Sequence, residues 1–197
     1  MSKKTIVILV VIAVLGIIFY SSIKGTFNNM NRGDQAIKAQ WAKVESQYQR
    51  RADLIPNLVN TVKGYADHEK ETLEAVVNAR AKATSTTIDP TNLNAASIQQ
   101  FQQAQGELSS ALSRLLVSVE RYPDLKANQN FLELQAQLEG TENRIAVERN
   151  RFNDTVQGYN ILVTEFPGRI YASIFGFQEK GYFQAQAGTE NAPTVEF

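Results

Sequence analysis

Apolar residues recur at helical spacing along almost the whole chain. The first segment after residue 34 places them four or three residues apart, with one slot skipped, at Ile37, Trp41, Val44, Tyr48 and Ile55. The most regular segment repeats every seven residues, at Phe131, Leu138, Ile145, Phe152, Tyr159 and Phe166. Before the C-terminal end, no useful length of sequence alternates apolar and polar residues as a β-strand would. The pattern predicts an all-α protein with coiled-coil-like helix contacts.

Loop-forming residues divide this pattern into four helices. Residues 84–94 cluster Thr, Asp, Asn and Pro and predict a loop, and prolines stop the third and fourth helices. Asp53 suits an N-cap, and Pro56 then lies in the first turn, so we predict that one helix ends and another begins here. The alternative is one long helix kinked at Pro56. Four helices joined by short links predict an antiparallel up-and-down four-helix bundle.

The start of the chain is apolar enough to cross a membrane. Residues 5–23 carry no charge and, at about 1.5 Å per residue, span roughly 28 Å. We predict a transmembrane helix whose partner is the lipid bilayer. A cleaved signal peptide is the alternative, but no pair of small residues ends the run as a cleavage site would. Lys3 and Lys4 favour a cytoplasmic N-terminus and a bundle on the periplasmic or external side.

Shifts in composition divide the chain into five parts. The junction before the first bundle helix is rich in Gly and Asn, and Asp34 suits the N-cap of that helix. The last part has the polar composition of a disordered segment. The predicted parts are a short tail (1–4), the transmembrane helix (5–23), a juxtamembrane linker (24–33), the helical bundle (34–177) and a flexible C-terminal tail (178–197).

Composition narrows the chemistry that the chain is able to perform. Lys plus Arg and Asp plus Glu number 20 each, so no net charge gathers nucleic acid. There is no cysteine, and His68 is the only histidine; the second histidine of a zinc-protease motif would stand at Thr72. A nucleophile elbow and a glycine-rich phosphate loop are also missing. We therefore predict a non-enzymatic protein without a cofactor, a metal site or catalytic residues.

Several charged or amide residues occupy or adjoin positions that the apolar repeat reserves for the interior. They are Arg51, Glu69, Gln105, Glu142, Glu148 and Arg149. We predict that they form one polar layer across the middle of the bundle, which fixes helix register because any slip leaves a charge unpaired. The alternative is that this layer is the ligand- or metal-binding site of an envelope sensor.

The last part of the chain offers candidate partner-binding residues. Ile170, Ile174 and Phe177 fall on one helical face, which packs either on the bundle or on a partner. Val195 and Phe197 lie beside the terminal carboxylate, an arrangement that C-terminus-binding domains recognise. The candidates for partner binding are Ile174, Phe177, Val195 and Phe197.

Three stretches of the sequence resemble the LemA family of bacterial membrane proteins. They are residues 47–83 (QYQRRADLIPNLVNTVKGYADHEKETLEAVVNARAKA), 138–160 (LEGTENRIAVERNRFNDTVQGYN) and 166–177, where Phe-Pro precedes IFGF. The resemblance implies a bacterial source, a helical bundle anchored by one N-terminal helix, and no established enzymatic activity. We expect a scaffold or adaptor in the bacterial inner membrane that contacts other envelope proteins. Homo-oligomers are also expected, because the anchor concentrates copies in two dimensions.

Overall fold

The computed structural model describes residues 3–185, and all the regular secondary structure in that range is helical. The elements are α1 (Lys3–Lys63), a short 3-10 turn η1 (Asp67–Glu69), α2 (Lys70–Ser85), α3 (Ala95–Val119), α4 (Pro123–Lys126), α5 (Gln129–Thr164) and α6 (Gly168–Phe175). The predicted all-α class is confirmed.

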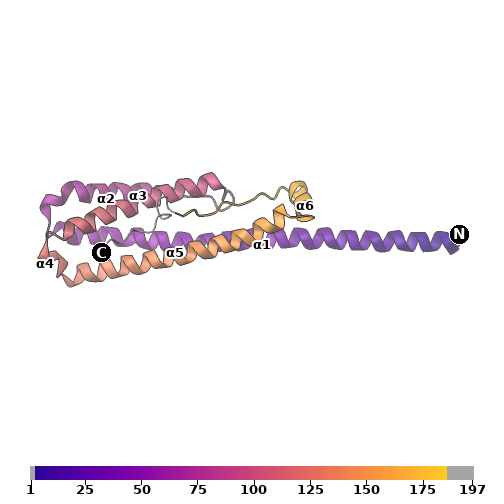
Figure 1. Ribbon diagram of the computed structural model, residues 1–197, viewed down its shortest axis with the longest axis horizontal. Helices are drawn as coiled ribbons and strands as arrows, with labels where there is room; N and C mark the ends of the chain where they lie inside the picture. The colour runs from indigo at the N-terminus through magenta and orange to yellow at the C-terminus, as the bar shows by residue number, and fades with distance from the viewer. Residues whose placement is uncertain (1–2, 186–197) are drawn as a thin grey trace, which may run out of the picture.

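The molecule is an elongated rod (Figure 1). In its body, α1, α2, α3 and α5 lie lengthwise beside one another, and the N-terminal part of α1 projects from one end as a single helix. We call this end proximal and the opposite end, where α4 lies, distal. The chain reverses at the distal end between α1 and α2 and again between α3 and α5. Helix α6 lies at the proximal end, beside the point where α1 leaves the body.

Helix α1 is continuous over 61 residues. Residues 24–33, predicted as a linker, are helical, and Asp34 lies inside the helix and caps no new one. Pro56 is also inside α1, so the predicted helix break after Asp53 is wrong and the alternative of one long helix holds. The predicted membrane segment and the predicted first bundle helix are therefore one element.

Contacts from a second helix explain why α1 continues through Pro56. Proline has no N–H, so the carbonyl of Ala52, four residues earlier, loses its helical hydrogen bond. Arg80 of α2 donates its Nε–H to this carbonyl at 2.8 Å. Ile55 and Leu58 on either side of the proline are fully buried. Tertiary contacts thus satisfy the group that the proline frees and hold both sides of it in the core.

The core consists of two hydrophobic clusters, one behind the other along the rod. The proximal cluster is rich in aromatic side chains and includes Met30, Ile37, Trp41, Val44, Tyr48, Phe101, Phe152, Tyr159 and Phe183. The distal cluster is mainly aliphatic and includes Ile55, Leu58, Val62, Leu73, Val76, Leu108, Leu115, Val119 and Leu138. Burial of each large apolar side chain contributes about 1.5–3 kcal/mol.

The seven-residue repeat of α5 supplies both clusters. Phe131 and Leu138 belong to the distal cluster, and Ile145, Phe152 and Tyr159 belong to the proximal one. Phe166, the last repeat position, lies beyond the end of α5, and its side chain is 85% exposed. The repeat therefore predicts the core up to the proximal end and fails where α5 stops.

Residues 177–185 form a non-helical segment, here called the strap, which runs from α6 back along the body (Figure 1). Phe183 of the strap is buried in the proximal cluster. The predicted flexible tail from residue 178 is thus corrected for residues 178–185, which are packed against the helices. Residues 186–197, with the candidates Val195 and Phe197, lie outside the described residues.

Candidate functional site

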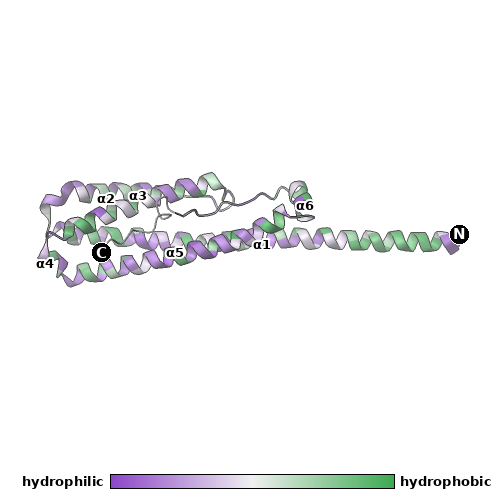
Figure 2. Ribbon diagram, viewed as in Figure 1, coloured by the Kyte–Doolittle hydropathy of each residue, from purple (hydrophilic) through white to green (hydrophobic). Residues whose placement is uncertain are grey.

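Figure 2 shows that the projecting part of α1 is hydrophobic along most of its length. Val7, Leu9 and Phe19, for example, are half or more exposed, and none of the most apolar 18-residue window of the helix is buried. A helix this long and apolar is able to cross a bilayer, and the cost of exposing such a surface to water favours that position. This surface supports the predicted membrane anchor.

Arg51 of α1 lies at the centre of a polar cluster between the two hydrophobic clusters. Its Nη1 donates to Glu142 at 2.7 Å and to Ser109 at 2.9 Å. Its Nη2 donates to the side-chain oxygen of Gln105 at 2.8 Å and to the Gln105 carbonyl at 3.3 Å. The guanidinium also lies over the Tyr48 ring, 5.2 Å from its centroid. Burial raises the pKa of the Tyr48 hydroxyl, although the charges of Arg149 and Arg51 act in the opposite direction.

This polar cluster joins all four long elements of the body. Arg51 comes from α1, Gln105 and Ser109 from α3, and Glu142 from α5. The side-chain amide of Gln105 donates in turn to the carbonyl of Ala83 in α2 at 3.1 Å. Three of the six residues predicted for the polar layer, Arg51, Gln105 and Glu142, thus lie together. The role predicted for the layer in fixing helix register stays a prediction.

The other three predicted members lie elsewhere. Glu69 is at the distal end, where it accepts from Arg121 at 2.7 Å and from the Tyr122 hydroxyl at 3.1 Å. Glu148 accepts from Gln40 at 2.7 Å, nearer the proximal end. Arg149 lies over the Phe183 ring, 4.8 Å from its centroid. Each of them pairs with a local neighbour, so the layer is smaller than the sequence predicts.

Side-chain amides hold the strap by its backbone. Asn153 of α5 donates to the Phe183 carbonyl and accepts from the Phe183 N–H, both at 2.9 Å. Asn160, two turns further along α5, makes the same pair of bonds to Lys180, also at 2.9 Å. Gln102 of α3 binds Gln184 in the same way, at 2.7 and 3.2 Å. Because three amides pair with backbone groups, the strap is held much as a β-strand would be, without a neighbouring strand.

An aromatic side chain and an ion pair fix the strap further. The Phe183 ring stacks on Trp41 with centroids 6.0 Å apart and meets the Phe152 ring edge-on at 5.5 Å. Lys180 pairs with Asp34 of α1 at 3.0 Å. Burial acts to raise the pKa of the Asp34 carboxyl, but bonds to Lys38 and Lys180 outweigh it and hold the pKa below its ordinary value.

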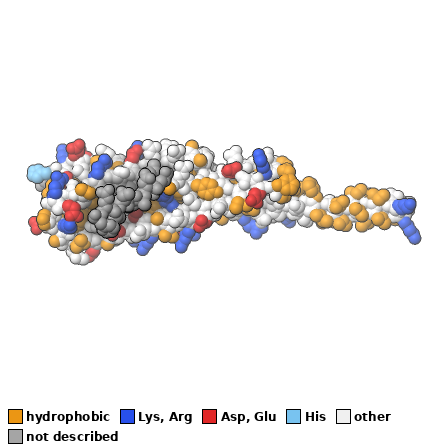
Figure 3. Space-filling view, in the orientation of Figure 1, with side chains coloured by type: hydrophobic (Ala, Val, Ile, Leu, Met, Phe, Trp, Pro, Cys, Tyr) orange, Lys and Arg blue, Asp and Glu red, His pale blue; other side chains and the backbone are white. Residues whose placement is uncertain are grey.

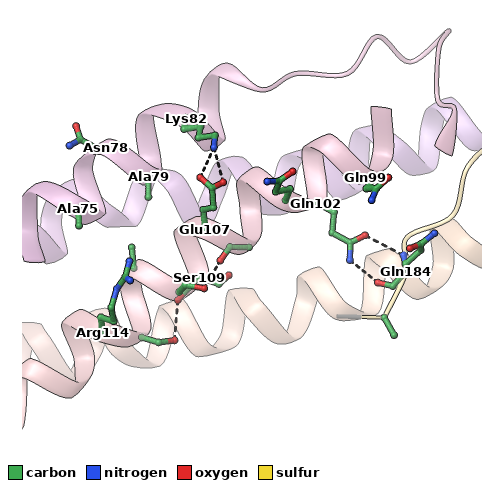
Figure 4. Close-up of a pocket in the computed structure, with 16 residues that line it drawn as sticks. Ala75, Asn78, Ala79, Lys82, Gln99, Gln102, Glu107, Ser109, Arg114 and Gln184 are labelled. Atoms are coloured by element: carbon green, nitrogen blue, oxygen red, sulfur yellow. Dashed lines mark hydrogen bonds and ion pairs between the residues drawn. The ribbon is translucent and has the colours of Figure 1, made fainter. Parts of the chain in front are cut away.

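An open groove of about 1060 Å³ runs between α2 and α3 (Figure 4). Small and amide side chains dominate its lining, with Ala75, Ala79, Gly106, Ser110 and Gln103 among them. Lys82 of α2 and Glu107 of α3 bridge the two helices at 2.7 Å. Nothing in the sequence predicts this groove, because small residues on a helix surface carry no periodic signal.

The partner-binding candidates Ile174 in α6 and Phe177 at the start of the strap have different surroundings. Ile174 is 67% exposed. Phe177 is half-buried, packs against the proximal cluster and meets the ring of Phe27 edge-on at 5.7 Å. Phe177 therefore holds α6 on α1, and Ile174 is available for contacts outside the chain.

Carboxylates in the centre of the body pair with arginines. Within residues 3–185, no three His, Asp or Glu side chains converge in a way that would hold a metal ion. In the centre of the body, Glu142 pairs with Arg51, and Glu148 pairs with Arg151 at 2.6 Å. These groups therefore give the fold ionic contacts and offer no preformed cluster of ligands.

Comparison with known proteins places the chain in a family. The family model described as LemA family matches residues 40–197. The chain is 25% identical over 169 residues to protein LemA of Metamycoplasma hominis, covering 86% of this chain and 70% of the relative. It is 26% identical over 195 residues to magnetosome protein MamQ 2 of Paramagnetospirillum magneticum, covering 89% of this chain and 71% of the relative. Over 80 residues it is 35% identical to magnetosome protein MamQ of Magnetospirillum gryphiswaldense, covering 41% of this chain and 29% of the relative. Since the family model spans most of its length, this chain belongs to the LemA family.

Proposed function

We propose that this protein is a non-enzymatic scaffold of the bacterial inner membrane, whose antiparallel four-helix bundle lies on the external side and binds other envelope proteins and further copies. The observation that carries the proposal is α1, which joins the membrane segment to the bundle core without a break. At about 1.5 Å per residue, the part of α1 beyond Ile23 extends roughly 60 Å from the bilayer. A helix of this kind presents a surface at a fixed height and orientation.

The polar cluster supports a structural role for the interior. Both terminal nitrogens of the Arg51 guanidinium donate to acceptors of the protein itself. A ligand at this position would have to displace those bonds and leave buried groups unpaired, at about 1–3 kcal/mol each. This supports a scaffold over a sensor that uses the polar layer.

The groove between α2 and α3 is the surface that we assign to a second copy. It runs along the rod, and a second rod anchored in the same membrane projects in the same direction. Small side chains such as Ala79, Gly106 and Ser110 let another backbone approach closely. Confinement to two dimensions raises the effective concentration of copies, so modest contacts suffice for assembly.

Crosslinking of single-cysteine variants tests this function, because the natural chain contains no cysteine. Ser110→Cys places a thiol in the groove, and Asn143→Cys places one on an exposed position of α5 as a matched control. We expect a short bis-maleimide to give covalent dimers from Ser110→Cys, and not from Asn143→Cys, in native membranes. A photo-crosslinking residue at Ser113 is expected to capture defined envelope proteins. Absence of both products would contradict the scaffold function.

A further inference from the structure

Three large apolar side chains form an exposed row at the proximal end. Phe166, Ile170 and Ile174 are spaced four residues apart and are 85%, 51% and 67% exposed. Ile170 and Ile174 belong to α6, and Phe166 precedes it by two residues. Side chains four apart lie above one another on a helix, so Ile170 and Ile174 form an apolar stripe on α6, and Phe166 adds a third exposed apolar side chain just before the helix. We call these three residues the α6 stripe.

The opposite face of α6 is packed tightly on the body. Gly168 and Ala172 are buried, and a Cβ at Gly168 would lie 2.1 Å from the Leu162 carbonyl oxygen, so only glycine allows this approach to α5. Phe175 meets the Phe27 ring of α1 edge-on, with centroids 5.0 Å apart. The position of α6 is therefore fixed relative to both α1 and α5.

This packing puts α6 at the level where the apolar segment of α1 ends. Phe27 lies four residues beyond Ile23, which is roughly 6 Å along the helix axis. The headgroup layer of a bilayer is about 5–8 Å thick on each side of the hydrocarbon core. Figure 3 shows hydrophobic side chains gathered at the neck where the body narrows into the projecting helix. Ile161 and Leu162 at the end of α5 add exposed apolar surface there.

We propose that the α6 stripe inserts into the surface of the lipid bilayer beside the transmembrane part of α1. The stripe lies on a helix that contacts α1 at Phe27, just beyond the apolar segment of the anchor, and helices with one apolar face bind at the boundary between headgroups and acyl chains. Lipid is thus the partner of Ile174, for which the sequence suggested a protein. A second lipid contact on one side of α1 sets the rotation and tilt of the bundle relative to the membrane.

Nitroxide labels on single cysteines test this contact in the full chain. The variants are Ile170→Cys, Ile174→Cys and, as a control that is equally apolar and 72% exposed at a distance from the membrane, Val117→Cys. The protein is reconstituted in vesicles of phosphatidylethanolamine and phosphatidylglycerol, and collisions with oxygen and with a water-soluble nickel chelate are compared. We expect labels at Ile170 and Ile174 to collide severalfold more with oxygen and severalfold less with nickel than the label at Val117.

Equal nickel accessibility at Ile170, Ile174 and Val117 in the vesicles would overturn the proposal. Protection of these labels in native membranes but not in pure lipid would also overturn it, because a protein would then cover the stripe. A second variant guards against misfolding: Gly168→Ala leaves the stripe intact but pushes α6 away from α5. With helix content and Trp41 fluorescence unchanged, the label at Ile174 is expected to lose its lipid protection in this background.

Discussion

The proximal and distal halves of the body, separated by the Arg51 cluster, are built on different principles. In the distal half, helices α1 to α5 contribute mostly aliphatic side chains to one cluster. In the proximal half, α2 does not contribute, and the strap and the loop before α3 complete an aromatic cluster around Trp41. Helical periodicity alone is enough to build the first core, whereas the second needs a non-helical segment held by specific side chains.

The difference extends to hydrogen bonding. Helices satisfy their own backbone groups, so the distal half depends mainly on apolar burial. The strap has no helix or sheet of its own, and Asn153, Asn160 and Gln102 pair with its backbone instead. We therefore expect the proximal half to be sensitive to single amide and aromatic substitutions that have no counterpart in the distal half.

Removal of the strap's aromatic side chain, Phe183, should have the largest effect on the stability of the proximal half relative to the distal half. Phe183→Ala should lower the free energy of unfolding by about 3–5 kcal/mol, because a buried ring is lost from a packed cluster. Trp41 is the only tryptophan and lies in this cluster, so its fluorescence reports on the proximal half, and far-ultraviolet circular dichroism reports on the whole body. The fluorescence transition should occur at a lower denaturant concentration than the loss of helix.

The matched distal variant is Leu115→Ala, which removes a fully buried side chain and should cost about 2–5 kcal/mol. Here the Trp41 signal should not change before helix is lost. If each variant shifts the fluorescence and the circular dichroism transitions together, the two halves unfold as one cooperative unit. Their stabilities would then not differ.

Substitution at the boundary between the halves has the next largest expected effect. Arg51→Met should reduce the free energy of unfolding by about 1–3 kcal/mol, because Gln105 and Ser109 lose a buried partner. Arg50→Met, at the exposed neighbouring position, should change it by less than about 0.5 kcal/mol. Cysteine pairs across α1 and α5 then report register. If Arg51→Met has one folded state, the same cysteine pairing between α1 and α5 and unchanged function, the prediction that Arg51 fixes helix register is wrong.

Loss of one amide side chain that binds the strap backbone should lower stability less, and its effect should be confined to the strap. Asn160→Ala removes both bonds to Lys180 and should cost about 1–3 kcal/mol, towards the lower end because the strap backbone gains access to water. Hydrogen exchange of the Lys180 amide should accelerate, while amides around Leu115 keep their protection. Asn150→Ala, at an exposed site on the same helix, is the control. Equal exchange in both variants would mean that the Asn160 side chain does not hold the strap.

The smallest expected effect is the loss of stability in acid when Asp34, the ion-pair partner of Lys180 in the strap, is protonated. Because the pKa of Asp34 is lower in the folded protein than its ordinary 3.8, the carboxylate stabilises the fold above that pH. This contribution is lost as the pH falls below 3.8 and through the folded value, and is on the order of 1 kcal/mol or less. The difference in stability between the natural chain and Asp34→Asn, measured from pH 6 to pH 2.5, should therefore shrink in acid. A constant difference would exclude the ion pair with Lys180 as its source.

Much of the distal half follows from the sequence, because the apolar repeat and the proline at 123 are local signals. The continuity of α1 does not follow from such signals. Its course through Pro56 depends on Arg80 from another helix, and its course through residues 24–33 is supported by burial of Met30. Both are tertiary contacts that outweigh local preference.

The polar cluster was predictable in part and the strap hardly at all. Charged or amide residues at or beside apolar positions of the repeat identified Arg51, Gln105 and Glu142, but the hydroxyl of Ser109 and the carbonyl of Ala83 give no such signal. A non-helical segment held by side chains of other elements shows no helical or strand periodicity in its own sequence. The one available clue was the pair Asn153 and Asn160, seven residues apart, each directly after an aromatic position of the repeat.

The rigidity that we propose for α1, between the predicted membrane segment and the body, is tested most directly by a distance between two nitroxide labels. Ser22→Cys and Lys43→Cys are both exposed and flank residues 24–33. In lipid nanodiscs, pulsed electron resonance should give one narrow distribution centred on roughly 31 Å, the length of 21 helical residues. A broad distribution that extends to much shorter distances would reveal a hinge and contradict a scaffold held at fixed height.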